Sequence, residues 1–285
     1  MNISVFKKVN TFVLTLLVLF SAIITSCERK SKSNDYEVVF DTIQVNKTES
    51  IDYKKSKLNC DLHISFIYPV ACKKTSMLND LQKLFVERVF PPQYSNFPPK
   101  EAVENFVNQY IDDYKSIKAE DFFEEDYILE DENEFIYELY LENEILYYKN
   151  NLISFIVKNM NYEGGAHASN SVYCYVIDLN KGNILTETDF AEYNYKENLA
   201  PIIAKKIATA KGLDDVSQLE GIGYTGLEDI VPNDNFIIDD KGITYYFNEY
   251  EIAAYFIGVT EVFIPYEELK DFITKDNPIY SLAGF

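Results

Sequence analysis

The residues with the clearest chemical potential lie in one short run, Gly164-Gly165-Ala166-His167. Consecutive glycines allow a tight backbone turn, and the imidazole of His167 could act there as a base or a ligand near neutral pH. General acid–base chemistry also needs a second titratable group at a defined position, and none with a defined spacing accompanies His167. Residues 164–167 are therefore a candidate functional loop, and an imidazole that caps a backbone group is its favoured interpretation.

The other nucleophiles and metal ligands lack the pattern that their chemistry requires. Cys174 lies in an apolar and aromatic run, which is typical of a buried thiol rather than a reactive thiolate. Ser169 and Ser171 have no Gly-x-Ser-x-Gly context, and His63 fits the polar side of a strand. Two histidines in the whole chain give no zinc ligand set. We expect no catalytic residue, no metal and no cofactor.

Cys60 and Cys72 flank a predicted strand and are twelve positions apart. In an oxidising compartment the two thiols could form a disulfide, although Cys174 would then remain as an odd thiol. Spacing alone cannot supply the Cα–Cα distance that a disulfide needs. The sequence leaves both alternatives open, a Cys60–Cys72 bridge and free thiols.

The chain is strongly acidic, with 46 Asp and Glu against 26 Lys and Arg, a net charge of −20 over 285 residues. This balance argues against a nucleic-acid partner, because phosphate binding needs clustered basic residues. A hydrophobic content of 47% is sufficient for a folded core. The acid is concentrated in residues 112–144, where it forms either a solvated face or a docking surface for a cationic partner. The centre of that candidate surface is Glu130, Asp131, Glu132 and Glu134.

The N-terminus has the pattern of a lipoprotein signal. Lys7 and Lys8 precede an apolar run over residues 11–24, which is shorter than the roughly 20 residues of a membrane span. The run ends in Ile24-Thr25-Ser26-Cys27, which resembles a bacterial lipobox. Cleavage before Cys27 would leave 24 basic and 46 acidic residues, a net charge of −22. We expect an exported protein that Cys27 anchors by lipid to the cell membrane or the outer membrane, and that faces the periplasm or the surface.

Runs of strands interrupted by helices, rather than strict alternation, predict an α+β fold. Helical spacing of apolar residues predicts helices over 78–90, from 99 onward and over 199–210, with a short last helix over 266–272. Alternating or apolar runs predict strands over 36–45, 58–70, 135–142, 145–148, 152–157, 172–178, 236–238, 243–247 and 261–264. We expect an N-terminal strand-and-helix part packed on a C-terminal antiparallel meander with one crossing helix.

Motifs in the second half resemble a known pair of modules. The motifs are Gly164–His167, the turn at 178–182, Gly242–Phe247, Glu251–Gly258 and Val262–Tyr266. They resemble the C-terminal module of RsiV-type anti-sigma factors, which also accompanies the catalytic domain of PdaC-type peptidoglycan deacetylases. Upstream, Tyr68-Pro69 and Leu78-Asn79 resemble the companion N-terminal module. The resemblance covers about residues 53–275, and Ala254 departs from it, because the family often has proline at that turn.

This resemblance divides the chain into a signal peptide (1–26), a lipidated cysteine and polar tether with a first strand (27–52), a PdaC-like module (53–160) and an RsiV-like module (161–280). It implies an envelope binding or sensing protein rather than an enzyme, because the family's hydrolase is a separate module that is not seen in this sequence. One family member binds lysozyme, so a cationic wall-active protein of that kind is the expected partner. The alternative is an envelope glycan or peptide hydrolase with an unrecognised site.

Overall fold

The computed structural model describes residues 35–53, 56–116, 137–164, 166–275 and 277–285. The predicted signal peptide, Cys27 and the centre of the predicted acidic surface, Glu130, Asp131, Glu132 and Glu134, lie outside these residues. In the part of the chain that is described, no helix is both long and apolar enough to cross a bilayer.

The larger of two sheets has six strands that follow the order of the chain. Its strands are β1 (Val38–Tyr53), β2 (Ser56–Cys72), β3 (Tyr137–Lys149), β4 (Leu152–Glu163), β5 (Ser169–Asp178) and β6 (Asn183–Leu185). All neighbours are antiparallel except β2 and β3, which are parallel. The mixture of this sheet, a second sheet and several helices confirms the predicted α+β class.

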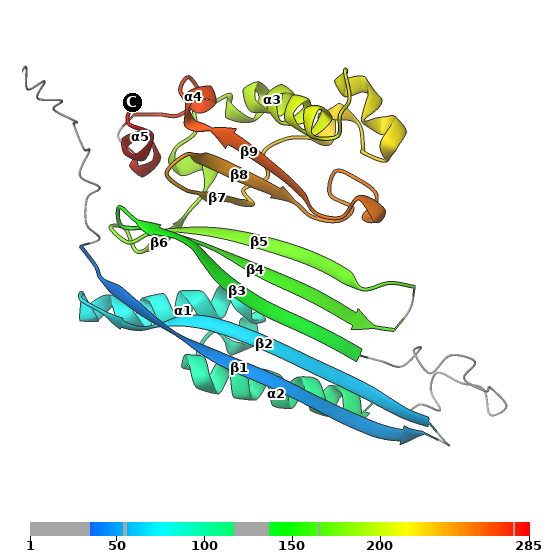
Figure 1. The fold of residues 1–285 in the computed structure, drawn as a ribbon. Helices are drawn as coiled ribbons and strands as arrows, with labels where there is room; N and C mark the ends of the chain where they lie inside the picture. The colour runs from blue at the N-terminus through cyan, green and yellow to red at the C-terminus, as the bar shows by residue number, and fades with distance from the viewer. Residues whose placement is uncertain (1–34, 54–55, 117–136, 165, 276) are drawn as a thin grey trace, which may run out of the picture. The chain divides into compact units, whose positions relative to one another are not determined.

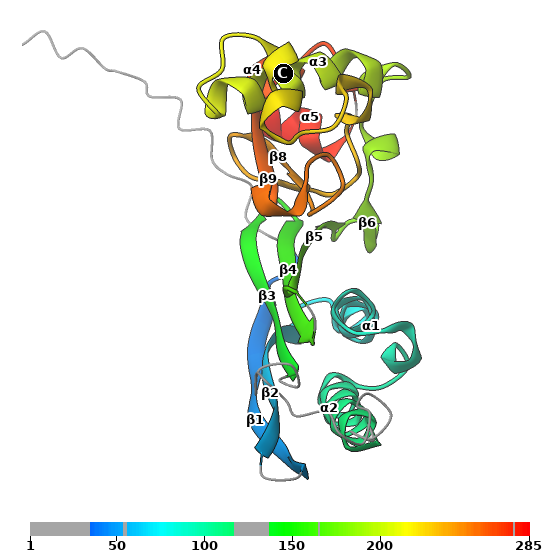
Figure 2. The same cartoon turned by 90° about the vertical axis from the view of Figure 1, so that its right-hand side faces the viewer.

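Two helices cover one face of this sheet, α1 (Leu78–Val89) and α2 (Pro99–Ser116). Figure 2 shows both on the same side of β1 to β3. The helices bury apolar residues that recur every three or four positions, and the Phe85 ring of α1 stacks on Phe155 of β4 at 4.6 Å between centroids. None of the described helices covers the opposite face of the sheet over β1 to β3 (Figure 2).

The N-terminal strands β1 and β2 join the meander at its edge, so that the two parts share one sheet. Leu62 of β2 pairs with Leu139 of β3 in the parallel register. Parallel neighbours need a long crossover, and α1 and α2 supply it. The two predicted segments 135–142 and 145–148 are one strand in the structure, with a bulge between Ile145 and Tyr147. The predicted module boundary at 160/161 falls inside β4, and it stays a prediction.

The second sheet is antiparallel and consists of β7 (Phe236–Ile238), β8 (Gly242–Phe247) and β9 (Thr260–Pro265). The predicted strands 236–238 and 243–247 pair as a hairpin, and the Asp239 carboxylate accepts hydrogen bonds from the backbone of Lys241 and Gly242 in its turn. Helix α3 (Tyr195–Ala210) packs on this sheet, and α4 (Tyr266–Leu269) and α5 (Pro278–Ala283) follow β9.

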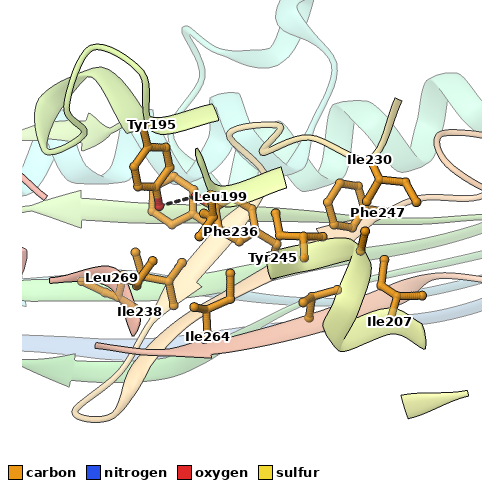
Figure 3. Close-up of a cluster of buried hydrophobic side chains, with 14 of the residues drawn as sticks. Tyr195, Leu199, Ile207, Ile230, Phe236, Ile238, Tyr245, Phe247, Ile264 and Leu269 are labelled. Carbon is orange, nitrogen blue, oxygen red and sulfur yellow. Dashed lines mark hydrogen bonds between the residues drawn. The ribbon is translucent and has the colours of Figure 1, made fainter. Parts of the chain in front are cut away.

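The core beneath α3 consists of aromatic and aliphatic side chains from α3 and all three short strands (Figure 3). The hydroxyls of Tyr195 and Tyr245 are buried there and share a hydrogen bond of 2.8 Å, drawn as the dashed line in Figure 3. Buried tyrosine hydroxyls need such partners, because an unpaired polar group in a core costs about 1–3 kcal/mol.

A buried carboxylate, Glu187, lies close to this pair at the start of a short 3-10 turn, Glu187–Asp189. Its Oε1 accepts from the backbone N–H of Asp234, and Lys196 Nζ lies 3.1 Å from its Oε2. Burial raises the pKa of Glu187 above its ordinary value near 4.5, although the hydrogen bond from Asp234 and the charge of Lys196 oppose this shift.

The two sheets are joined by polar contacts. The Ser154 hydroxyl of β4 donates to the carbonyl of Ile238 at 2.7 Å and accepts from its N–H at 3.2 Å. The Asn235 side chain accepts from the N–H of Cys174 and donates to the carbonyl of Val172, and so satisfies the open edge of β5. We infer that the sheets form one cooperative structure.

Candidate functional site: an exposed aromatic cluster at the Gly164–His167 loop

The predicted functional loop connects β4 to β5 and carries His167 on its surface. Gly164 has a φ of 86°, a left-handed conformation that favours glycine, and Gly165 lies outside the described residues. The Nδ1 atom of His167 is 3.0 Å from the carbonyl oxygen of Ala168. Because a carbonyl only accepts, Nδ1 carries the proton, and Nε2 can accept from the Tyr250 hydroxyl at 3.4 Å. The imidazole therefore caps a backbone group, as the favoured interpretation of the sequence has it.

The structure adds to this histidine three aromatic rings that lie more than 80 positions further along the chain. Tyr250, Tyr255 and Phe256 come from the loop between β8 and β9. The His167 ring stacks on Tyr255 with centroids 4.3 Å apart and planes 8° apart. Tyr250 lies on Tyr255 at 6.1 Å, and Phe256 meets Tyr255 edge-on at 6.4 Å. We call these four residues the aromatic cluster.

The aromatic cluster is unusually exposed for its composition. Tyr250, Tyr255 and Phe256 keep 64%, 45% and 65% of their surface in contact with solvent. Scattered exposed apolar residues are ordinary, but adjacent ones in contact with each other mark interaction surfaces. Aromatic rings with a polar tip are also the side chains that dominate binding energy in protein interfaces.

Several hydrogen bonds hold the cluster's second loop in place. Asn248 accepts from the N–H of Val172, and the Asn170 side chain donates to Glu249 Oε1 at 3.0 Å. On the other side, the N–H of Ala254 donates to the carbonyl of Gly223 at 2.8 Å. Such fixation lowers the entropy that a partner has to remove on binding.

Gly223 lies next to both Ala254, through the backbone hydrogen bond, and the ring of Phe256. A proline at position 254, which the resembled family often has, could not donate this N–H. At Gly223, where φ is +105°, a Cβ atom would lie 2.6 Å from the Phe256 ring. The left-handed φ favours glycine at position 223, and the absence of a Cβ leaves room there for the Phe256 ring.

Two other tyrosines of the second half, Tyr224 and Tyr246, are buried. They retain only 4% and 7% of their surface, so they cannot contact a partner as Tyr250 can. Tyr246 packs with Ile156 and Cys174 between the two sheets. Sequence spacing could not identify Tyr255 as a residue of this site, because its stacking partner His167 is 88 positions away.

The structure contradicts the disulfide alternative. Cys60 and Cys72 are free thiols in the single extended strand β2. At about 3.3 Å per residue their Cα atoms are about 40 Å apart, whereas a disulfide needs about 4.4–6.8 Å. Burial also raises the pKa of the Cys60 thiol to about 11.

Cys174 is buried, and burial raises the pKa of its thiol, which agrees with the predicted packing role. Within the described residues no group of three or more His, Cys, Asp or Glu side chains is arranged to hold a metal ion. The arrangement that the structure does present is a set of exposed aromatic rings in contact with one another.

Comparison with known proteins places a family domain in this region. Residues 183–267 match the family model described as "Protein of unknown function (DUF3298)". The chain therefore contains a DUF3298 domain. It includes the whole β8–β9 loop with Tyr250, Tyr255 and Phe256, whereas His167 precedes it.

Two solved structures resemble most of the chain. The crystal structure of a DUF3298 family member from Bacteroides fragilis is 27% identical with a TM-score of 0.78, and the match covers 88% of this chain and 99% of that chain. A DUF3298 family protein from Pseudomonas aeruginosa is 14% identical with a TM-score of 0.56, and the match covers 83% and 95%, a similarity of fold alone. Among curated proteins, none is similar enough to count as a match.

Proposed function

We propose that this protein is a lipid-anchored binding or sensing protein of the cell envelope, and that its aromatic cluster engages a cationic wall-active protein such as a lysozyme. The observation that carries the proposal is the exposure of Tyr250, Tyr255 and Phe256 on loops held by hydrogen bonds. Interfaces bind most strongly through such aromatic groups when they are already in place.

Charge supports the choice of a basic partner. The chain has a net charge of −20, and Glu249 and Glu251 flank Tyr250 within the exposed loop. Complementary fields speed the encounter with a partner and discriminate against proteins of the wrong sign. The resemblance to RsiV-type and PdaC-type modules points in the same direction, because one member of that group binds lysozyme.

The predicted lipid anchor supports a role in the cell envelope. The lipobox-like Ile24-Thr25-Ser26-Cys27 would place the protein on the outer side of the cell membrane, or on the outer membrane, where wall-active proteins occur. A lipid anchor suits a sensor, because it holds a folded domain next to the wall without a membrane-spanning helix.

The test is a titration of the purified full-length protein with a basic lysozyme, compared with two variants. Tyr255→Ala should weaken the affinity by about thirtyfold, the loss of about 2 kcal/mol that is expected for an interface anchor. Tyr193→Ala is the matched control, because Tyr193 is the most exposed tyrosine of the described residues and precedes α3, outside the cluster. No binding by the native protein at low salt, or an equal loss in both variants, would refute the proposal.

We propose binding without catalysis, and a parallel assay separates this from the hydrolase alternative. The protein is incubated with purified peptidoglycan and with model esters, and soluble products are measured. We expect no turnover. Turnover that His167→Ala abolishes would make the loop a catalytic site and would overturn this part of the proposal.

A further inference from the structure

A second surface lies on the open face of the six-stranded sheet, opposite α1 and α2. A groove of about 480 Å³ crosses β1 to β5 on this face. Two neighbouring cross-strand rows supply most of its lining. In the first, Asn46 pairs with His63, His63 with Tyr140, Tyr140 with Met160 and Met160 with Asn170, and the second runs through Gln44, Ser65, Glu142, Lys158 and Val172. Its volume is in the range of small-ligand sites, about 300–1,000 Å³.

The centre of the groove is a pair of stacked rings. The parallel pairing of β2 and β3 brings His63 beside Tyr140, with centroids 4.4 Å apart and planes 14° apart. The Asn46 side-chain oxygen lies 2.8 Å from His63 Nδ1 and fixes the orientation of the imidazole. Tyr140 keeps 42% of its surface exposed, so the ring pair presents apolar area and a hydroxyl to a ligand.

The rest of the lining combines apolar side chains, among them Leu141 and Val172, with polar ones. Gln44, Asn46 and Asn170 contribute amides, and serines contribute hydroxyls. Among the lining residues the charged side chains are Glu142 and Lys158, and they pair with each other at 3.5 Å, while Lys158 also pairs with Glu144, which is not a lining residue, at 3.4 Å. A chain with 46 acidic residues thus places a nearly neutral groove on its surface. The formal charges of the lining residues sum to zero, so the lining itself selects neither an anion nor a cation.

We propose that this groove is a second binding site, and that it takes a neutral glycan chain. A sugar ring has an apolar C–H face that packs on an aromatic ring and a rim of hydroxyls that both donate and accept, as amides do. Five strands separated by about 4.8 Å give a row about 19 Å long, which suits a chain of sugars rather than a single ring.

The groove ends beside the aromatic cluster but does not include it. Asn170 lines the groove, and its side chain donates to Glu249, the residue before Tyr250. A glycan in the groove would therefore lie next to a protein bound at the aromatic cluster. Different residues would contact the ligand at the two sites, so a substitution can abolish binding at one site and leave binding at the other unchanged.

The experiment is calorimetric titration of the full-length protein, in a detergent without a sugar headgroup, with the N-acetylglucosamine oligomer chitohexaose as the probe. We expect saturable binding that Tyr140→Ala weakens at least about tenfold, with a smaller loss for Asn46→Ala. Tyr173→Ala is the matched control, because Tyr173 is a strand tyrosine of similar exposure, 48%, that does not line the groove. Tyr255→Ala should leave chitohexaose binding unchanged, which separates this site from the proposed protein-binding site.

Three results would overturn the glycan site. The first is no saturable binding at millimolar chitohexaose. The second is an equal loss of affinity in Tyr140→Ala and Tyr173→Ala. The third is binding of a hexa-arginine peptide that Tyr140→Ala abolishes while chitohexaose does not bind, which would assign the groove to a cationic peptide instead.

Discussion

The imidazole of His167 stacks on the ring of Tyr255 at 4.3 Å, and this contact joins a loop of the six-stranded sheet to a loop of the three-stranded sheet. The two residues are 88 positions apart, and neither loop alone contains the cluster. The binding surface that we propose therefore forms only when both sheets are folded and packed against each other. A change in the interface between the sheets should accordingly reach the aromatic cluster.

The first prediction concerns the glycine that seats Phe256. Gly223→Ala should lower stability by about 1–2 kcal/mol for the left-handed backbone and should also displace the Phe256 ring, because the added Cβ would lie 2.6 Å from it. Gly212→Ala is the control, because Gly212 has a φ of +71° and nothing within 4 Å of an added Cβ. Thermal unfolding should show a similar loss from strain in both, whereas lysozyme affinity should fall only in Gly223→Ala. Equal affinities would show that the position of Phe256 does not matter.

The second prediction concerns the contact between the sheets. Ser154→Ala removes a hydroxyl that donates to the Ile238 carbonyl and accepts from its N–H, and leaves both backbone groups buried. We expect a loss of about 1–3 kcal/mol in urea unfolding, with a single transition. Ser169→Ala, on an exposed position of β5, should cost less than about 0.5 kcal/mol. Two separate transitions in the native protein would contradict the inference of one cooperative structure.

The third prediction is a pH dependence of stability at Glu187. Burial raises its pKa in the folded protein above the ordinary value near 4.5. Protonation of Glu187 therefore stabilises the folded protein. This contribution is fully present below the pKa that Glu187 has in the unfolded chain, and it is lost as the pH rises through its pKa in the folded protein. Lys196, which is half exposed, partly compensates the ionised form at 3.1 Å.

Lys196→Met should raise the pKa of Glu187 further and should cost about 1–2 kcal/mol at pH 7, discounted from the value of a fully buried pair because of solvent screening. At pH 4, where Glu187 is protonated in both proteins, the loss should nearly disappear. Lys205→Met, an exposed position on the same helix, should show no such pH dependence. A loss from Lys196→Met that is the same at pH 4 and pH 7 would exclude the ion pair as its cause.

Most elements follow from local patterns, but their partners do not. The alternation in β2 and the helical spacing in α1 predict both elements within about two residues. The parallel pairing of β2 with β3 could not be predicted, because alternation fixes which face of a strand is buried and not which strand lies beside it. The His63–Tyr140 stack depends on that pairing, so the groove could not be predicted from the sequence either.

Buried and exposed tyrosines were hard to separate for a related reason. Tyr245 and Tyr246 are consecutive in β8, so alternation would expose one of them. Both are buried, because Tyr245 faces the core under α3 while Tyr246 faces Ile156 of the other sheet. The Cys60–Cys72 alternative stayed open because the predicted strand ends at residue 70. In the structure β2 continues to Cys72, and twelve extended steps separate the two Cα atoms by about 40 Å.

The fourth prediction concerns the anchor. Cys27→Ala should move the protein from the membrane fraction to the soluble fraction, because two or more acyl chains anchor stably and none remains in the variant. Fractionation with mass spectrometry of the N-terminal peptide measures both location and lipid. Reductant should leave the melting temperature of the native protein unchanged, because the described cysteines Cys60, Cys72 and Cys174 are free. If the share of the protein in the membrane fraction is the same for Cys27→Ala as for the native protein, the lipobox interpretation is wrong.

The last prediction separates the roles of charge and of the aromatic cluster in partner binding. Replacement of Glu130, Asp131, Glu132 and Glu134 by their amides should slow association with a basic lysozyme more than it speeds dissociation, because long-range charge acts on the encounter. Tyr255→Ala should do the reverse, because desolvated anchors are lost after docking and act on dissociation. Raising the ionic strength from 0.01 M to 0.15 M shortens the Debye length from about 30 Å to about 8 Å, so it should mimic the charge variant and leave the effect of Tyr255→Ala intact. If salt and the charge variant both leave the association rate unchanged, the acidic run is a solvated face, and partner choice rests on the cluster alone.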